Sequence, residues 1–441
     1  MAWTSTTGET GVRTSLWLPG DGDSVTVLTF YAIALIAIPS RLVLGPLGGA
    51  GSPATVVGLG CLLWWLFAHL CRPFPTRFGW QPVRAGLIAF ALAVLASYVQ
   101  ACVRPIDPIE FSSATLALVL LGGWAGVLLV ANDGIRDIER LLTLVRRVVA
   151  LGACMAALGI TQFVTHQPLV DRISIPGLVA NHTGFGLTMR EGFTRPAGTA
   201  THPIEYGAVV TMLLPLALAL AMGDRSRSGL RRWLPVALMA ACVPLSISRS
   251  ALLASAVGTI IVLASWPPKA RRTAFGVTMV GSVVVYLTIP GMLGSLLGLF
   301  TGIGGDSSAQ SRTGSYAIAA DFISRSPLLG RGFQTFLPSY RILDNQYLGM
   351  LIEIGFVGIA AFLFLVFSAM RSARETRRAG STETVRQLGQ GLLGAVAAGA
   401  VTLALFDALS FPMSAGMFFL VLGLAGGARR LVVSERRGLL T

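Results

Sequence analysis

The chain has 441 residues, of which 54% are hydrophobic and only 12% are charged, and its mean hydropathy is +0.71. A soluble domain usually carries about twice that charged fraction, so the composition excludes a soluble enzyme and indicates a polytopic membrane protein. The net charge of +14 would favour nucleic-acid binding in a soluble protein. Here it fits basic loops that face the cytoplasm and its anionic lipids, so nucleic acid is not expected as a partner.

Apolar runs long enough to cross a bilayer recur along the whole chain. We expect about twelve transmembrane helices, at residues 24–44, 54–70, 84–100, 114–131, 148–164, 204–222, 233–247, 251–266, 273–292, 345–369, 388–407 and 412–426. This pattern predicts an all-α polytopic membrane fold. The first 23 residues are polar and Gly-rich, and no small-residue cleavage site follows the first apolar run, so no cleavable signal peptide is expected.

The distribution of Lys and Arg sets the expected orientation, because short cytoplasmic loops carry an excess of both. Basic segments alternate with less basic ones, and one assignment places all of the basic segments inside: 72–84, 136–147, 225–232, 269–272, 371–378 and 429–437. Both termini are then cytoplasmic, which requires an even number of spans and agrees with twelve.

Two long loops then face outward, at residues 165–203 and at 293–344, the second between the ninth and tenth spans. Loops of this length in a compact bundle are usually functional. We divide the chain into an N-terminal bundle of five spans (1–164), a core that holds both outer loops (165–370) and a C-terminal pair of spans with a cytoplasmic tail (371–441).

The second outer loop contains a predicted surface helix and a tight turn. In Ser311–Arg325 the apolar residues Tyr316, Ala319, Ala320 and Ile323 suggest one face of an amphipathic helix. Ser326-Pro327 is expected to end this helix, and Gly330-Arg331-Gly332 is typical of a tight turn.

Eight arginines fall at or beyond the outer surface on this topology: Arg172, Arg190, Arg195, Arg249, Arg312, Arg325, Arg331 and Arg341. Because basic loops normally stay inside, outer arginines indicate an anionic ligand, and the planar guanidinium suits phosphate. For Arg249 the alternative is snorkelling to the lipid headgroups, and for Arg195 it is a solvated loop charge. Arg195 and Arg249 are the first candidates, Arg312 and Arg331 the second, and the other four are interpreted as surface charges.

Asp344 lies where the second outer loop re-enters the membrane. It fits an ordinary N-cap, and it also fits a general base beside the arginines, although a cap lowers a carboxylate's pKa and weakens it as a base. Glu353 and Asp407 are expected to face the bundle as structural polar groups. His202 is either a base or an inert loop histidine. The five cysteines lack metal-ligand spacing, so neither a metal nor another cofactor is expected.

Three segments together resemble the family of O-antigen ligases and polymerases. They are Arg195-Pro-Ala-Gly-Thr…His202-Pro203, Ser248-Arg249-Ser250-Ala251, and Ser326-Pro-Leu-Leu-Gly-Arg-Gly332 followed by Asp344-Asn345-Gln-Tyr347-Leu and Glu353-Ile-Gly355-Phe-Val-Gly358. The last is the most specific, since the family pattern is a PLLGxG turn, a His/Asp-Asn-x-Tyr-Leu helix start and an ExGxxG continuation. The resemblance covers roughly residues 195–365.

The resemblance implies a metal-independent, inverting glycosyltransferase with a GT-C-like helical membrane fold. Its donor is then a glycan on undecaprenyl diphosphate, at the outer face of the bacterial plasma membrane. By position, Asp344 replaces the histidine that is the proposed base of the ligases. The residues assigned to substrate are Arg195, Arg249, Arg312 and Arg331 for the diphosphate, and His202, Asn345 and Tyr347 for other contacts.

The aspartate at position 344 favours polymerisation, or transfer to another glycan, lipid or protein acceptor, over ligation to lipopolysaccharide. Fixed arginines stabilise the charge that develops on a leaving diphosphate, and membrane lipids surround the site. Two alternatives stay open: a flippase or transporter of lipid-linked oligosaccharide, and a non-catalytic component of envelope assembly. A transporter should place charged residues near the bilayer midplane, whereas here most gather at the outer surface.

Overall fold

The computed structural model describes residues 23–71, 80–181, 188–190, 192–289, 291–292, 294 and 307–436, with side chains left out for 307–314. Its helices are α1 (Ser24–Ile36), α2 (Pro53–Leu70), α3 (Pro82–Val103), α4 (Pro108–Asp133), α5 (Ile138–Thr165), α6 (Pro203–Gly223), α7 (Gly229–Leu245), α8 (Arg249–Leu263), α9 (Pro268–Thr288), α11 (Ser307–Arg325), α12 (Gln346–Ala379), α13 (Glu383–Leu405) and α14 (Pro412–Arg436). Proline at the first turn and capping side chains such as Ser52, Asp107 and Asp137 start several of them.

Short strands and 3-10 turns connect the helices at one end of the molecule. Strand β1 (Leu42–Val43) pairs antiparallel with β2 (Val179–Ala180), with Leu42 opposite Ala180, and β3 (Thr188–Arg190) pairs antiparallel with β4 (Phe193–Arg195), with Thr188 opposite Arg195. The 3-10 turns are η1 (Gly45–Gly51), η2 (Leu169–Arg172) and η4 (Ala408–Ser410).

Each of the twelve expected spans coincides with a helix, which confirms an all-α polytopic membrane protein. Within the described residues, eight helices are long and apolar enough to cross a membrane: α2, α3, α4, α5, α6, α12, α13 and α14. Helices α1, α7 and α8 are shorter, with 13, 17 and 15 residues. The expected span 24–44 is too long, because α1 ends at Ile36, shortly before Pro39. The count of twelve membrane crossings stays a prediction.

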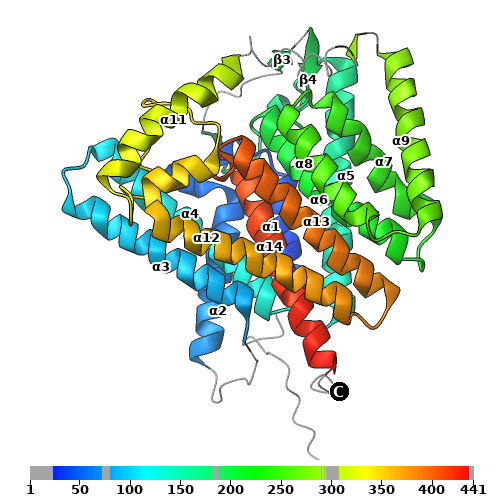
Figure 1. Cartoon of the computed structure of the whole chain (residues 1–441), viewed down its shortest axis with the longest axis horizontal. Coiled ribbons are helices and arrows are strands. Elements are labelled where there is room, and N and C mark those ends of the chain that lie inside the picture. Colours follow the sequence, from blue (N-terminus) through cyan, green and yellow to red (C-terminus); the bar gives the residue numbers. More distant parts are fainter. Residues whose placement is uncertain are drawn as a thin grey trace, which may run out of the picture.

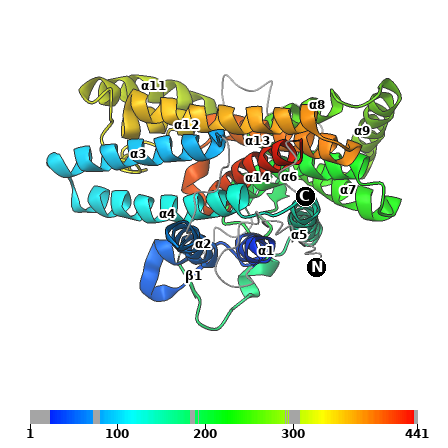
Figure 2. The ribbon, with the colours of Figure 1, turned by 90° about the horizontal axis from the view of Figure 1, so that it is seen from below.

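Helices α6 and α14 form the centre of the bundle. The apolar windows of α6 and α14 are 94% and 89% buried, whereas that of α2 is only 22% buried. Helix α14 is enclosed by α4, α6, α12 and α13 (Figure 2). Helix α9 lies at the rim (Figure 1) and buries none of its residues. The outer helices therefore present their apolar side chains to the surroundings, as expected in a bilayer.

The loops gather at two ends of the bundle. At one end, ion pairs such as Arg84–Asp133 (3.3 Å) and Arg146–Asp224 (2.8 Å) connect basic segments to acidic residues of neighbouring helices and loops. The opposite end carries β3, β4 and α11 (Figure 1). Both long loops therefore lie at one end and the basic segments at the other.

Helix α12 is broken in its first half at Gly355, whose φ of 62° is outside the helical range. The turn at residues 327–332 supplies the missing hydrogen bonds. Arg331 N and Gly332 N donate to Ile352 O (3.1 Å) and Glu353 O (2.9 Å), and Phe356 N donates to Pro327 O (2.9 Å). A Cβ on Gly355 would lie 2.4 Å from Leu328 O, so only glycine fits. Broken helices are tolerated inside membrane proteins where the backbone is satisfied in this way.

The surface helix of the second outer loop is present as α11 and ends at Arg325, which confirms Ser326-Pro327 as its stop. Its expected face is partly wrong, because Tyr316 is 57% exposed while Ala319 is fully buried. Ala319, Phe322 and Ile323 pack on a small cluster formed by Phe336, Leu343 and Ile352. The helix turns toward this cluster because the 333–343 segment supplies apolar side chains that no sequence pattern of α11 reveals.

Candidate functional site

Arg195 ends strand β4 and is only 6% exposed. Its Nε donates to Ser246 O at 3.0 Å, while its Nη2 is buried with no hydrogen-bond partner among the described residues. Burial, followed by the nearby charge of Arg190, lowers the pKa of Arg195 to about 10. A buried cation without a carboxylate partner among the described residues is costly, so a bound anion would stabilise this guanidinium.

The turn that accepts from Arg195 also carries Arg249. Ile247 adopts a left-handed conformation with φ of 43°, which is rare for a β-branched residue and marks local strain. Ser248 caps α8, accepting from Ala251 N at 3.4 Å, and its hydroxyl lies 2.8 Å from that of Ser250. Arg249 is therefore the first residue of α8, where the helix dipole also favours an anion.

His202 caps α6 beside these arginines. Its Nδ1 accepts from Ile204 N at 3.1 Å, which leaves the proton of the neutral ring on Nε2. Burial, followed by the charge of Arg195, lowers the pKa of His202 to about 4. The imidazole is consequently neutral at neutral pH and is a hydrogen-bond donor at Nε2, but a weak base.

Asp344 does not cap α12. Asn345 does, accepting from Leu348 N at 3.2 Å, so the N-cap interpretation of Asp344 is wrong. Asp344 instead has φ of 51° and precedes the cap. Aspartate tolerates this left-handed conformation better than most residues, and it places Asp344 just before the start of the helix. The hydroxyl of Tyr347, in the first turn of α12, donates a hydrogen bond to Ala400 O (3.0 Å) of α13.

Asp407 lies next to Asp344, a pairing that the sequence did not reveal. The backbone N–H groups of Asp344 and Asn345 donate to its carboxylate, and burial, followed by the charge of Asp344, raises the pKa of Asp407 to about 6. Gln346 strengthens the junction by accepting from Leu409 N at 2.9 Å. Two carboxylates thus meet where the second outer loop joins α12 and where α13 ends.

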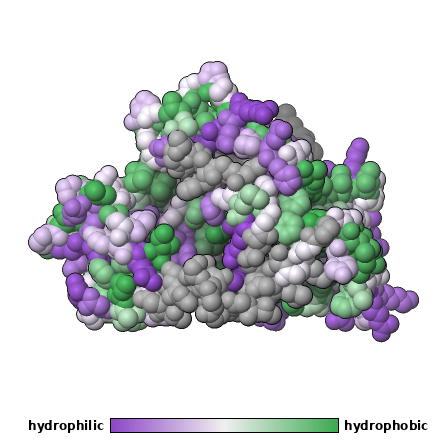
Figure 3. Space-filling model, turned by 90° about the horizontal axis from the view of Figure 1, so that it is seen from above, coloured by the Kyte–Doolittle hydropathy of each residue, from purple (hydrophilic) through white to green (hydrophobic). Residues whose placement is uncertain are grey.

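The segment 406–411, called the corner below, connects the two groups of polar side chains. The His202 ring lies 6.2 Å from that of Phe411, and Phe411 lies 5.5 Å from Phe406, the residue before Asp407. Hydrophilic residues are visible in the recessed middle of this end of the molecule (Figure 3). The corner is therefore contacted by His202, which lies near Arg195, and it contains Asp407, which lies near Asp344.

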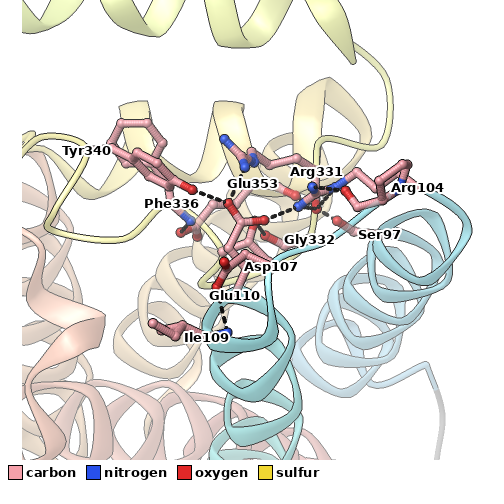
Figure 4. Close-up of polar contacts among 12 residues, drawn as sticks. Ser97, Arg104, Asp107, Ile109, Glu110, Arg331, Gly332, Phe336, Tyr340 and Glu353 are labelled. Carbon is pink, nitrogen blue, oxygen red and sulfur yellow. Dashed lines mark hydrogen bonds and ion pairs between the residues drawn. The ribbon is translucent and has the colours of Figure 1, made fainter.

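Arg331 has a different environment, centred on Glu110 of α4 (Figure 4). Glu110, only 2% exposed, accepts from Arg331, from Arg104 Nη2 at 2.6 Å and from the Tyr340 hydroxyl at 2.6 Å. The Arg331 guanidinium also lies 4.9 Å from the centroid of the Phe322 ring. Arg331 thus already has a carboxylate partner, although Arg104 shares it and Arg331 Nε has no hydrogen-bond partner among the described residues. The partner argues against the prediction that Arg331 binds diphosphate.

The other outer arginines are less informative. Arg312 lies in α11, where its side chain is outside the part of the chain that the structure describes. Arg325 forms an exposed pair with Asp321 at 2.5 Å, as expected for a surface charge. Glu353 accepts from Phe336 N at 3.3 Å, which confirms its expected role as a structural carboxylate. Among the described residues, no three His, Cys, Asp or Glu side chains come together as a metal site.

Comparison with known protein families gives a match in the second half of the chain. Residues 234–363 match the O-antigen ligase family. This match supports membership of the O-antigen ligase family and a role in the ligation or polymerisation of cell-surface polysaccharide by a glycosyltransferase-like enzyme of the membrane. It implies a lipid-linked glycan donor and an acceptor in general terms. No curated protein is significantly similar to the chain.

The O-antigen ligase match includes Arg249, Arg331 and Asp344, whereas Arg195 and Asp407 lie outside it. It also contains both halves of the joint between the 327–332 turn and the break in α12. The motif that carried the resemblance in the sequence is thus a structural joint, and its function is to fix the loop that ends at Asp344.

Proposed function

We propose that this member of the O-antigen ligase family transfers a glycan from undecaprenyl diphosphate to an acceptor hydroxyl at the outer face of the bacterial plasma membrane. The observation that supports it best is Arg195, which is only 6% exposed and has an Nη2 without a partner in the described residues. A diphosphate supplies the negative charge and the oxygen acceptors that such a guanidinium needs.

The reaction divides between the two sides of the corner. The acceptor oxygen forms a bond to C1 of the donor sugar, and the bond from C1 to the diphosphate oxygen breaks. Asp344 takes the acceptor proton, which is general base catalysis. Arg195 and Arg249 stabilise the charge on the departing undecaprenyl diphosphate, and the neutral His202 can add an N–H donor.

Asp407 supports Asp344 in this scheme. Two neighbouring carboxylates disfavour each other's ionisation, so ionised Asp407 makes Asp344 a stronger proton acceptor. An aspartate base replaces the histidine of the ligases in the resemblance, and for this reason we favour polymerisation of a glycan over ligation to lipopolysaccharide. The sugar acceptor then arrives on a second lipid-linked chain.

The test uses the full-length protein in nanodiscs with lipid-linked glycans isolated from the producing cells, and it follows release of undecaprenyl diphosphate together with glycan product. Asp344→Asn and Arg249→Gln should each abolish both signals. Asp321→Asn and Arg325→Gln, which break an exposed ion pair at the same end, are the matched controls and should retain them. Full activity in both site variants would overturn the proposal.

A flippase is the second candidate, favoured by one observation: broken helices such as α12 occur at the substrate sites of transporters. Here, however, the backbone groups at the break are bonded to the 327–332 turn. Movement of lipid-linked glycan across vesicles without release of undecaprenyl diphosphate would favour the flippase. Neither release nor movement, with the glycan product still dependent on this protein in cells, would favour a non-catalytic component.

A further inference from the structure

A cavity of about 280 Å³ opens beside the corner, between α1, α2, α4 and the start of α14. Leu35, near the end of α1, and Pro412, the first residue of α14, line it, so it belongs to the end of the bundle that carries the long loops. It is close in size to the smaller ligand pockets of proteins, which begin at about 300 Å³.

The lining of this cavity is polar but uncharged. None of the described residues that line it carries a charge. Hydroxyl and amide side chains provide both donors and acceptors: Ser52, Thr55, Asn181, Thr201, Gln334 and Ser410. Trp124 and Tyr31 contribute apolar surface. A sugar ring needs this combination, since it carries hydroxyls at its edge and C–H groups on its faces.

The cavity is connected to the proposed reaction centre through three segments. Thr201 immediately precedes His202, and Ser410 closes the 3-10 turn that follows Asp407. Gln334 comes from the loop that leads to Asp344, and it has φ of 62°. Glu353 holds this strained conformation, since it accepts hydrogen bonds from the backbone of Gln334 and Phe336. The same joint that fixes Asp344 therefore also presents Gln334 to the cavity.

We propose that this cavity is a subsite for an uncharged sugar ring of the substrate, and that it selects neutral sugars over acidic ones. The inference rests on the proposed function and specifies its substrate class. A uronic acid would bury a carboxylate against hydroxyls and amides alone, without a cation among the described lining residues, and such burial is unfavourable. The diphosphate binds to the arginines, whereas the neutral ring binds in the cavity.

Binding without turnover provides the first test. The full-length protein in nanodiscs is examined by saturation-transfer NMR with methyl glucoside and with methyl glucuronide, which differ in charge at one carbon. The glucoside should give the signal, and the double variant Thr55→Val with Gln334→Leu should reduce it about fivefold or more, since each lost hydrogen bond contributes on the order of 1 kcal/mol. Thr161→Val and Gln100→Leu, on exposed faces of α5 and α3, are the matched controls and should leave it unchanged.

A variant that adds a charge distinguishes loss of binding from misfolding, because it is expected to gain binding of a different sugar. Gln334→Glu keeps the side-chain size and adds a carboxylate, so it should gain binding of methyl glucosaminide, a cationic amino sugar, and lose preference for the glucoside. Equal signals from glucoside and glucuronide in the wild type, or no change in the double variant and no gain in Gln334→Glu, would overturn the proposal.

Steady-state kinetics then show whether the sugar ring in the cavity belongs to the donor or to the acceptor. If the cavity holds the donor sugar, the double variant should raise KM for the lipid-linked donor; if it holds the acceptor terminus, it should raise KM for the acceptor. Either result supports the subsite, and unchanged values of both overturn it. If the cavity binds glucoside while Arg195→Gln and Asp344→Asn retain full transfer, the site assignment fails and the subsite stands.

Discussion

Arg195 and Arg331 are two buried arginines at the same end of the molecule, and they differ in what balances their charge. Arg331 has Glu110 as a carboxylate partner, which it shares with Arg104, and it has aromatic rings beside it, although its Nε also lacks a hydrogen-bond partner within the described residues. Arg195 has a backbone carbonyl, and its Nη2 has no partner within the described residues. A balanced cation holds a fold together, whereas an unbalanced one is suited to an anionic ligand. The partner of an arginine, rather than its burial, therefore indicates its role.

The largest effect on transfer is expected at Asp344, the carboxylate that ends the second outer loop. Asp344→Asn removes the proposed base but keeps the shape of the side chain, so transfer should fall by roughly 10²- to 10⁴-fold. Release of undecaprenyl diphosphate measures it. Asp321→Asn, an exposed aspartate on α11, should stay within about twofold of the wild type, a range expected for surface changes. A rate near that of the wild type for Asp344→Asn would remove Asp344 from the mechanism.

Arg195→Gln should lower the rate of transfer by about 10²- to 10³-fold, the usual cost of removing one charge-stabilising donor. Because the unbalanced buried charge disappears, the melting temperature should remain the same or rise. Arg325→Gln is the matched surface control and should change neither quantity. A large loss of folding stability in Arg195→Gln would show that its charge is structural.

Glu110→Ala tests the other arginine. It leaves Arg331 and Arg104 without their shared carboxylate, and removal of one partner from a buried pair costs about 3–5 kcal/mol. Thermal or denaturant unfolding in detergent should show this loss. Glu110→Gln, which keeps acceptor capacity for Arg104 and Tyr340, should be milder. Unchanged stability in Glu110→Ala would mean that the cluster does not hold the second outer loop.

Asp407 should give activity and stability opposite dependences on pH. Its pKa is raised to about 6, so it becomes protonated as the pH falls through 6. Transfer should then decrease by up to about tenfold per pH unit. A raised carboxylate pKa means that protonation favours the folded state, so this group should add stability as the pH falls from 6 toward 4. Asp407→Asn should abolish the stability change, and its persistence would contradict the assignment.

Much of the architecture followed from local patterns, but the partners of the charged groups did not. The helices could be predicted from the apolar runs, whereas Arg195 and Arg249 were singled out by the segments that resemble the O-antigen ligases and polymerases. The pairing of Glu110 with Arg331 and that of Asp344 with Asp407 join residues far apart in the chain, and no periodicity encodes them. Asp344 could not be distinguished from a cap either, because Asn345 offers the same chemistry one residue later.

The most direct test of the comparison is thermal unfolding of the full-length protein with and without inorganic pyrophosphate, measured in parallel for the wild type, Arg195→Met and Arg331→Met. Pyrophosphate should raise the melting temperature of the wild type and of Arg331→Met, which starts lower because Glu110 has lost a partner. Arg195→Met should start as high as the wild type and should not respond. An equal response in all three proteins would contradict the claim that Arg195 binds the diphosphate.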